Sequence, residues 1–263
     1  KTPTPNPIIY NMLEMQRKAS ICRIGAYCAF IAGACYSLIV CCAFLSPSTI
    51  ASYVTSAQYF EDFKSYRNIF IFLKALMIIA NASFVGVVLA FHSLCRAKNY
   101  GKMTLFSALA IIGLGVGVFQ SVIDMTMVPY LADQYAMGSS IVKEVIIAIG
   151  VANPAIYIIS LGFPGLWFVF VSIMALDNPN LPKLLIFLGF MWGIGNIVTV
   201  FAHVVVIIWL IYLVAFGALC AAPVWSIWEG LYLLRISDDL QSQIQKKVEI
   251  YLEEKKSEAS DNY

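Results

Sequence analysis

The feature that most constrains this chain is a set of long apolar stretches that carry no charge. Residues 184–228 contain no Asp, Glu, Lys or Arg, and residues 24–60 contain none either. A helix needs about 20 mainly apolar residues to cross the hydrocarbon core of a bilayer. Charged residues make up 12% of the chain, against about 25% in soluble domains. The composition therefore excludes a soluble enzyme, a disordered chain and a nucleic-acid-binding protein, and it indicates a polytopic membrane protein.

We predict an all-α fold, a transmembrane helical bundle with six spans. The apolar stretches place these spans at about 24–45, 69–94, 103–125, 148–176, 184–205 and 213–234. The last two spans come from one stretch, and the turn between them is expected around Val206 to Tyr212. Pro154 and Pro164 are expected to kink the fourth span or to break off its first turns.

The distribution of Lys and Arg predicts the orientation of this bundle. Thirteen of these residues fall on the side of the two termini and three on the opposite side, and positive charge marks the cytoplasmic side. We therefore expect an inner (plasma) membrane protein with both termini in the cytoplasm. The first span is too long to be the apolar core of a cleaved signal peptide.

The chain divides into an N-terminal cytoplasmic arm (1–23), a transmembrane domain (24–235) and a cytoplasmic tail (236–263). In the tail, apolar residues recur every four positions with Lys, Glu and Gln between them, at Leu240, Ile244, Val248 and Leu252. This spacing is typical of an amphipathic helix that lies on the membrane surface or against a partner.

Three ionisable residues lie within or at the ends of the predicted spans, where charge is costly and often functional. Lys74 and Asp124 are near the outer ends of the second and third spans, so this antiparallel hairpin allows them to meet. The alternative is that Lys74 extends outward along its own aliphatic stem. Glu229 is near the inner end of the last span, where we expect it to pair with Arg235 or another Arg at the inner side, or to extend to the surface.

Two amides, Asn81 and Asn196, fall near the middle of their spans. Interhelical hydrogen bonds are the usual role of such residues. If both face one cavity with the Pro-kinked fourth span, they line a polar pathway together with Lys74, Asp124 and Glu229.

The sequence predicts neither a metal site nor a cofactor. His92 and His203 are expected at opposite sides of the bilayer, so one haem or metal ion cannot use both. A pigment held by one of the two histidines stays open. The seven cysteines form no CxxC pair. The glycines at 113, 115 and 117 lie within a span, which favours close helix packing over phosphate binding.

The C-terminal half resembles an uncharacterised family of small bacterial integral membrane proteins with six to seven spans, a domain of unknown function. The resemblance covers about 153–235 and rests on Gly165-Leu166-Trp167-Phe168, Leu181-Pro182-Lys183, Leu188-Gly189, Gly193-Ile194-Gly195, Pro223-Val224-Trp225, Trp228-Glu229-Gly230 and Leu234-Arg235. It implies a bacterial inner-membrane bundle, and it brings no assigned reaction.

Three functions are compatible with these features, and no known catalytic motif points to an enzyme. The first is a non-catalytic subunit that scaffolds or stabilises a larger membrane assembly, with the bilayer and other membrane subunits as its partners. The second is a small transporter or channel with a polar pathway near Lys74, Asp124 and the amides. The third is a lipid-binding or lipid-sensing protein, in which Glu229 meets head groups beside a tryptophan-rich interface.

Overall fold

The computed structural model describes residues 7–47, 56–95, 100–151, 154–176, 181–205 and 207–260. Within these ranges the regular structure is entirely helical. The helices are α1 (Pro7–Leu45), α3 (Ala57–Cys95), α4 (Tyr100–Met137), α5 (Ser140–Val151), α6 (Pro154–Ala175), α7 (Lys183–Val205) and α8 (Ile208–Ser260). The predicted all-α class is confirmed for these residues.

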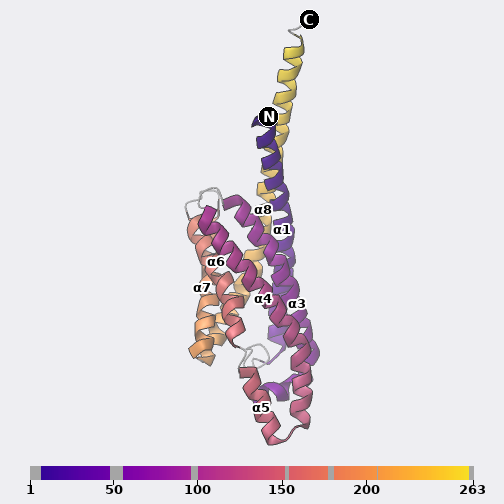
Figure 1. The fold of residues 1–263 in the computed structure, drawn as a ribbon, viewed down its shortest axis with the longest axis vertical. Helices are drawn as coiled ribbons and strands as arrows, with labels where there is room; N and C mark the ends of the chain where they lie inside the picture. Colours follow the sequence, from indigo (N-terminus) through magenta and orange to yellow (C-terminus); the bar gives the residue numbers. More distant parts are fainter. Residues whose placement is uncertain are drawn as a thin grey trace, which may run out of the picture.

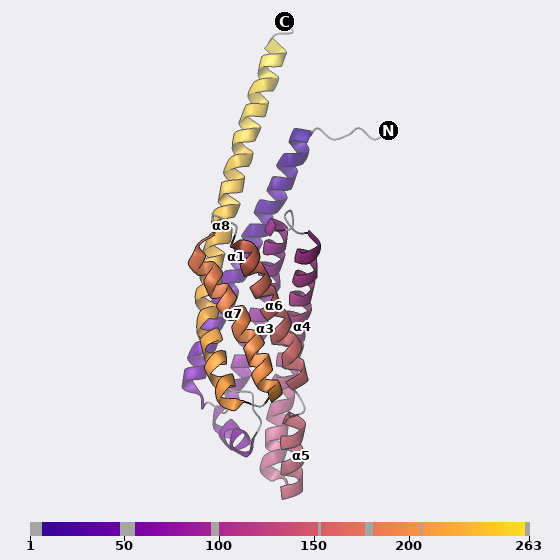
Figure 2. The ribbon, with the colours of Figure 1, turned by 90° about the vertical axis from the view of Figure 1, so that its left-hand side faces the viewer.

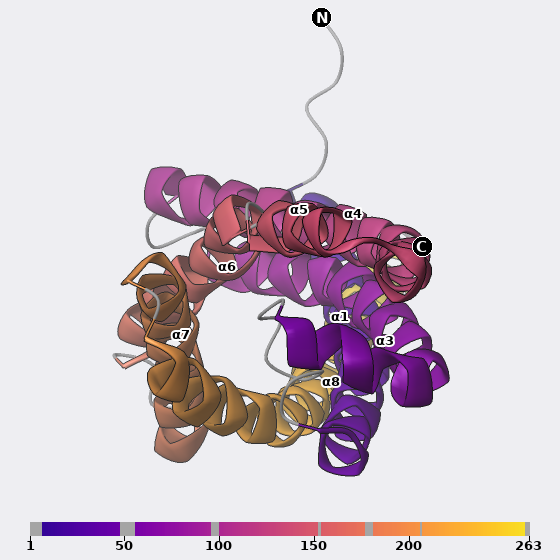
Figure 3. The same cartoon turned by 90° about the horizontal axis from the view of Figure 1, so that it is seen from below.

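Six of the helices form a closed ring in chain order. Helix α1 packs against α3, α3 against α4, α4 against α6, α6 against α7 and α7 against α8, and α8 returns to pack against α1. Figure 3, a view from below, shows these helices arranged around a common centre. Helix α5 contacts α4 and does not take part in the ring.

The two ends of the ring differ. The start of α1 and the end of α8 project from the same end (Figures 1 and 2), which we call the tail end. Helix α5 lies at the opposite end, which we call the α5 end. Near the tail end α1 and α8 are joined by a hydrogen bond from the buried Ser237 hydroxyl to the Ala19 carbonyl, at 2.9 Å, and by an ion pair between Arg23 and Asp238.

Five helical segments of the described chain are long and apolar enough to cross a membrane. They are Tyr10–Leu45, Ala57–Cys95, Tyr100–Met137, Ile158–Ala175 and Lys183–Val205. The chain therefore has the character of a multi-pass membrane protein. The sixth predicted span, 213–234, falls within α8, where several side chains lie outside the described residues; it stays a prediction.

Helices α3 and α4 are longer than a membrane is thick. They contain 39 and 38 residues, or nearly 60 Å at about 1.5 Å per residue, against about 30 Å of hydrocarbon. Their extra length lies at the α5 end, where α3, α4 and α5 share a small apolar cluster of Tyr59, Phe60, Phe63, Phe70, Tyr135 and Ile146. An exposed ion pair between Arg67 and Asp133, at 3.0 Å, links α3 to α4 there.

The positions of proline explain where α6 begins and why α8 continues without a break. The fourth apolar stretch is broken before Pro154, so that α5 ends at Val151 and α6 starts at Pro154, while Pro164 stays inside α6. Helix α7 ends at Val205 and α8 begins at Ile208, which agrees with the start of the predicted turn. No break separates the last predicted span from the tail, because the sequence contains neither Gly nor Pro from 231 to 260.

Glycines mark the points where neighbouring helices of the ring approach most closely. A Cβ on Gly113 of α4 would lie 2.5 Å from the Pro164 side chain of α6, and one on Gly193 of α7 would lie 2.8 Å from the Gly165 carbonyl of α6. Gly115, between the two α4 glycines that face neighbours, meets nothing within 4 Å. Small residues thus allow close helix contact in the apolar region, as the sequence predicted.

Candidate functional site

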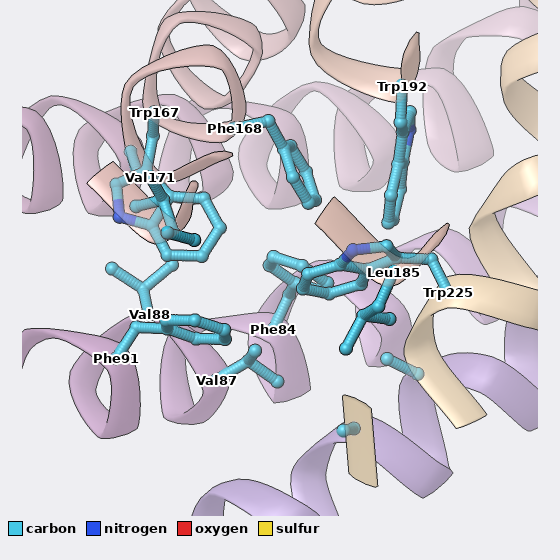
Figure 4. Close-up of a cluster of buried hydrophobic side chains, with 14 of the residues drawn as sticks. Phe84, Val87, Val88, Phe91, Trp167, Phe168, Val171, Leu185, Trp192 and Trp225 are labelled. Atoms are coloured by element: carbon cyan, nitrogen blue, oxygen red, sulfur yellow. The ribbon is translucent and has the colours of Figure 1, made fainter. Parts of the chain in front are cut away.

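An aromatic cluster fills the middle of the ring. Its rings come from α3, α6, α7 and α8 and belong to Phe84, Phe91, Trp167, Phe168, Trp192 and Trp225 (Figure 4). The ring centroids of Phe168 and Trp192 are 4.3 Å apart, and those of Phe84 and Trp225 are 5.8 Å apart. The centre of the ring of helices is therefore packed with side chains, and buried polar groups lie on both sides of this cluster.

Lys74 and Asp124 meet on the α5 side of the aromatic cluster. The Lys74 ammonium lies 2.5 Å from an Asp124 carboxylate oxygen, and the two side chains are 2% and 8% exposed. The amide of Gln120, one turn earlier on α4, donates to the other Asp124 oxygen. Because both charges are buried and hydrogen-bonded, this pair connects α3 to α4 and leaves no uncompensated charge there.

Glu229 lies on the other side of the aromatic cluster, one turn closer to the tail end than Trp225. Its exposed fraction is 0%, and neither carboxylate oxygen accepts a hydrogen bond from any residue that the structure describes. A carboxylate that is removed from water without a partner is strongly destabilising. Glu229 is therefore the polar group of this interior whose environment is least satisfied.

The expected pair of Glu229 with Arg235 does not form, and this prediction was wrong. A pair with another Arg at the same side is not seen among the described residues, and Arg96 lies outside them. Six residues along an α-helix correspond to about 600° of rotation, which leaves the two side chains on different faces of α8. Residues three or four apart would share a face. Extension of Glu229 to the surface does not occur either, because the side chain is fully enclosed.

Three residues from three helices lie within electrostatic reach of Glu229. They are Cys22 of α1, Cys95 of α3 and Tyr232 of α8. Cys95 follows Phe91 by one turn of α3, just as Glu229 follows Trp225 by one turn of α8, and the Phe91 and Trp225 rings are stacked with centroids 6.3 Å apart. Glu229 and Cys95 thus each follow a residue of this aromatic pair by one helical turn, toward the tail end.

The two predicted amides serve separate helix contacts. The Asn81 amide of α3 lies against Gly117 of α4, at 2.9 Å from the position a Cβ would take there. Asn196 of α7 is buried against Gly165 of α6, where a Cβ would lie 3.0 Å from the Asn196 Cβ. Each amide thus packs at a glycine on a neighbouring helix, which supports a packing role for both.

The histidines and cysteines give no metal centre. No group of three or more His, Cys, Asp or Glu side chains that could hold a metal ion occurs in the described part of the chain. His203 shares a 2.8 Å hydrogen bond with the Thr199 carbonyl of its own helix, and the His92 ring lies edge-on to Tyr100 near the tail end. The seven cysteines are free thiols.

Sequence reasoning missed several buried polar groups that have no partner among the described residues, namely the hydroxyls of Ser107 and Ser226 and the indole of Trp167. The indole N–H of Trp167 on α6 is buried without an acceptor among the described residues, and its ring lies 5.7 Å from Phe91, perpendicular to it. Trp167 belongs to the Gly165–Phe168 motif, which we interpreted as a packing feature. A buried tryptophan usually gives its N–H a partner, and that expectation is the signal that could have singled it out.

Residues 31–236 match the protein family described as Domain of unknown function (DUF4386). The chain belongs to this family. The match includes all of α3, α4, α6 and α7 and parts of α1 and α8, and it extends well beyond the C-terminal half on which the sequence resemblance rested. No curated protein and no solved structure matches the chain. The DUF4386 region contains Lys74, Asp124 and Glu229, so both buried polar sites belong to the family's part of the chain.

Proposed function

We propose that this protein is a small membrane transporter that takes up a cation at Glu229. The observation that carries the proposal is the carboxylate of Glu229, which is fully buried within the ring and has no partner among the described residues. Ionisable groups of this kind in membrane proteins commonly bind the transported ion or a proton. A bound cation or proton would satisfy this buried carboxylate.

The position of Glu229 suits alternating uptake and release. Counted along α3 and α8, Glu229 and the Lys74–Asp124 pair are separated by roughly 30 Å, at about 1.5 Å per residue, which is close to the thickness of the hydrocarbon core. The aromatic cluster lies between them. We infer that a cation reaches Glu229 from the tail end. The aromatic cluster then has to rearrange before the cation can move toward the α5 end.

We also infer a topology of six spans with both termini in the cytoplasm of a bacterial inner membrane. The placement of α8 in the ring between α7 and α1 supports a sixth span. The excess of Lys and Arg on the side of the termini supports a cytoplasmic tail end. In this orientation Glu229 takes up its cation from the cytoplasm.

Cation-driven currents from reconstituted liposomes on a solid-supported membrane test the transport proposal. Jumps in pH, sodium and organic ammonium ions are applied to the wild-type protein, to Glu229→Gln and to Glu253→Gln, a control that removes an exposed carboxylate of the same helix. We expect a current for at least one cation that is lost in Glu229→Gln and retained in Glu253→Gln. Wild-type currents no larger than those of empty liposomes, or equal currents from Glu229→Gln, would refute the proposal.

A second candidate function is a non-catalytic subunit of a larger assembly, which the projecting ends of α1 and α8 favour. Val248, Ile250 and Leu252 of α8 are 38%, 55% and 52% exposed, and Lys and Glu residues lie around them. Such a mixed helix suits docking to another subunit or to lipid head groups.

Purification in mild detergent should then retain a partner in fixed stoichiometry, and truncation after Gln245 should release it. Recovery of the full chain alone, or with selectively bound lipid, would contradict the subunit role, and bound lipid would favour lipid sensing.

A further inference from the structure

We propose that Glu229 and the aromatic side chains beside it form a binding site for a lipophilic organic cation, namely an ammonium group attached to an aromatic or aliphatic body. This inference rests on the proposed transport function and specifies its substrate class. Two groups of observations carry it: a buried carboxylate that accepts no hydrogen bond from the described residues, and the aromatic rings one helical turn away from it.

The charge of the ligand follows from Glu229 itself. Both carboxylate oxygens are buried and accept no hydrogen bond from the described residues. The ionised carboxylate would repel an anion, and a neutral ligand would leave Glu229 either protonated or charged without a partner. A cation satisfies the carboxylate directly, and an ammonium group adds N–H donors or a diffuse positive charge.

The apolar body of the ligand follows from the rings one helical turn away from the carboxylate. Trp225 precedes Glu229 by one turn of α8, Phe91 stacks on Trp225, and Trp167 lies edge-on to Phe91 at 5.7 Å. Aromatic faces attract cations, most strongly where water is excluded, and they also cover apolar ligand surface. A carboxylate next to aromatic rings therefore fits an organic cation better than a hydrated inorganic ion.

Other cationic ligands fit this site less well. A divalent metal ion prefers several charged or imidazole ligands, and the described residues offer no group of three such side chains. A zwitterion such as an amino acid also needs a positively charged partner for its own carboxylate. The groups within electrostatic reach of Glu229 are the thiols of Cys22 and Cys95 and the phenol of Tyr232. An amine without a carboxylate avoids this requirement.

The path from the tail end to the site is short. Glu229 lies two turns, about 12 Å, before Ser237. Among the residues of α8 whose side chains are described, Ser237 is the last one that is buried. Beyond Ser237 the helix runs exposed beside α1. Because Glu229 is enclosed in this structure, a ligand larger than a proton enters only when α8 separates from its neighbours over these two turns.

Equilibrium dialysis of the purified full-length protein in detergent tests the site with three soluble probes. Benzyltrimethylammonium carries both the charge and the ring, tetramethylammonium carries the charge alone, and phenylacetate combines a ring with the opposite charge. We expect saturable binding of benzyltrimethylammonium, at least tenfold weaker binding of tetramethylammonium, and no saturable binding of phenylacetate. Equal binding of phenylacetate and benzyltrimethylammonium would show apolar partitioning and overturn the proposal.

Variants assign the binding to the two parts of the site. Glu229→Gln should weaken benzyltrimethylammonium binding at least tenfold, Glu229→Asp should retain part of it, and Glu253→Gln should leave it unchanged. Trp225→Leu should reduce the preference for benzyltrimethylammonium over tetramethylammonium. A folded Glu229→Gln protein that binds like wild type would overturn the proposal. If Glu229→Gln does not fold, an unchanged preference in Trp225→Leu overturns it instead.

The same measurements separate this inference from the transport function. If benzyltrimethylammonium does not bind but inorganic cations give currents that depend on Glu229, the substrate class is wrong and the transporter stands. If no cation gives such a current and no probe binds, both proposals fail. If the probe binds and no cation gives a current, the site is a receptor for organic cations and the transport function is wrong.

Discussion

Replacing Lys74 by methionine should destabilise the protein by several kilocalories per mole. Methionine keeps the length of the lysine stem and removes its charge, so that Asp124 stays buried and still accepts a hydrogen bond from Gln120. Removing one partner of a buried ion pair costs about 3–5 kcal/mol, because the other charge stays in the interior uncompensated. For a chain of this size, that loss lowers the thermal midpoint by on the order of 10 °C.

The double variant separates this charge effect from a loss of packing. Adding Asp124→Leu to Lys74→Met removes the stranded carboxylate, and replacing a buried pair by apolar side chains is often close to neutral. We therefore expect the double variant to recover most of the stability that the single variant loses. A double-mutant cycle gives the coupling between the two residues directly.

The control lies on the same two helices. Arg67 and Asp133 also join α3 to α4, but their side chains are 44% and 52% exposed, and exposed pairs contribute about 0–1 kcal/mol. Thermal unfolding in detergent, followed by near-ultraviolet circular dichroism, compares Lys74→Met with Arg67→Met. A loss for Lys74→Met no larger than for Arg67→Met would refute the interpretation of the buried pair as a clamp between α3 and α4.

Two smaller predictions concern the contacts between helices of the ring. Gly113→Leu should destabilise the protein by at least about 1–3 kcal/mol, because a Cβ there would meet Pro164 and the Ile159 carbonyl. Gly115→Leu should change stability by less than about 0.5 kcal/mol. Equal thermal midpoints for the two variants would contradict the packing between α4 and α6. Ser237→Ala should cost about 1 kcal/mol by removing the hydrogen bond to α1, and an unchanged midpoint would show that this bond does not hold α8 to α1.

Much of the fold could be predicted from the sequence, because the cost of placing charge in lipid limits where helices can lie. The charge-free stretches predicted the apolar spans, and Pro154 marked the start of α6. The antiparallel hairpin of α3 and α4 brought Lys74 and Asp124 within reach of each other. These features depend on local composition or on elements next to each other in the chain.

The closure of the ring and the state of Glu229 could not be predicted in this way. Contact between α1 and α8 joins helices from opposite ends of the sequence, and residues such as Ala19 and Ser237 at their contact do not specify a partner. The environment of Glu229 depends on which residues of α1 and α3 face it across the ring. The length of α8 was also missed, because a change from apolar to charged residues alters the surroundings of a helix without ending it.

Labelling with dicyclohexylcarbodiimide most directly tests the central claim, that the buried carboxyl group of Glu229 has no partner among the residues that the structure describes. This reagent enters membranes and adds to protonated carboxyl groups in apolar surroundings, and mass spectrometry of peptides locates the adduct. We predict labelling at Glu229, protection by benzyltrimethylammonium but not by phenylacetate, and no comparable labelling at the exposed Glu253. An unlabelled Glu229, or labelling of Glu229 and Glu253 to the same extent, would contradict the account.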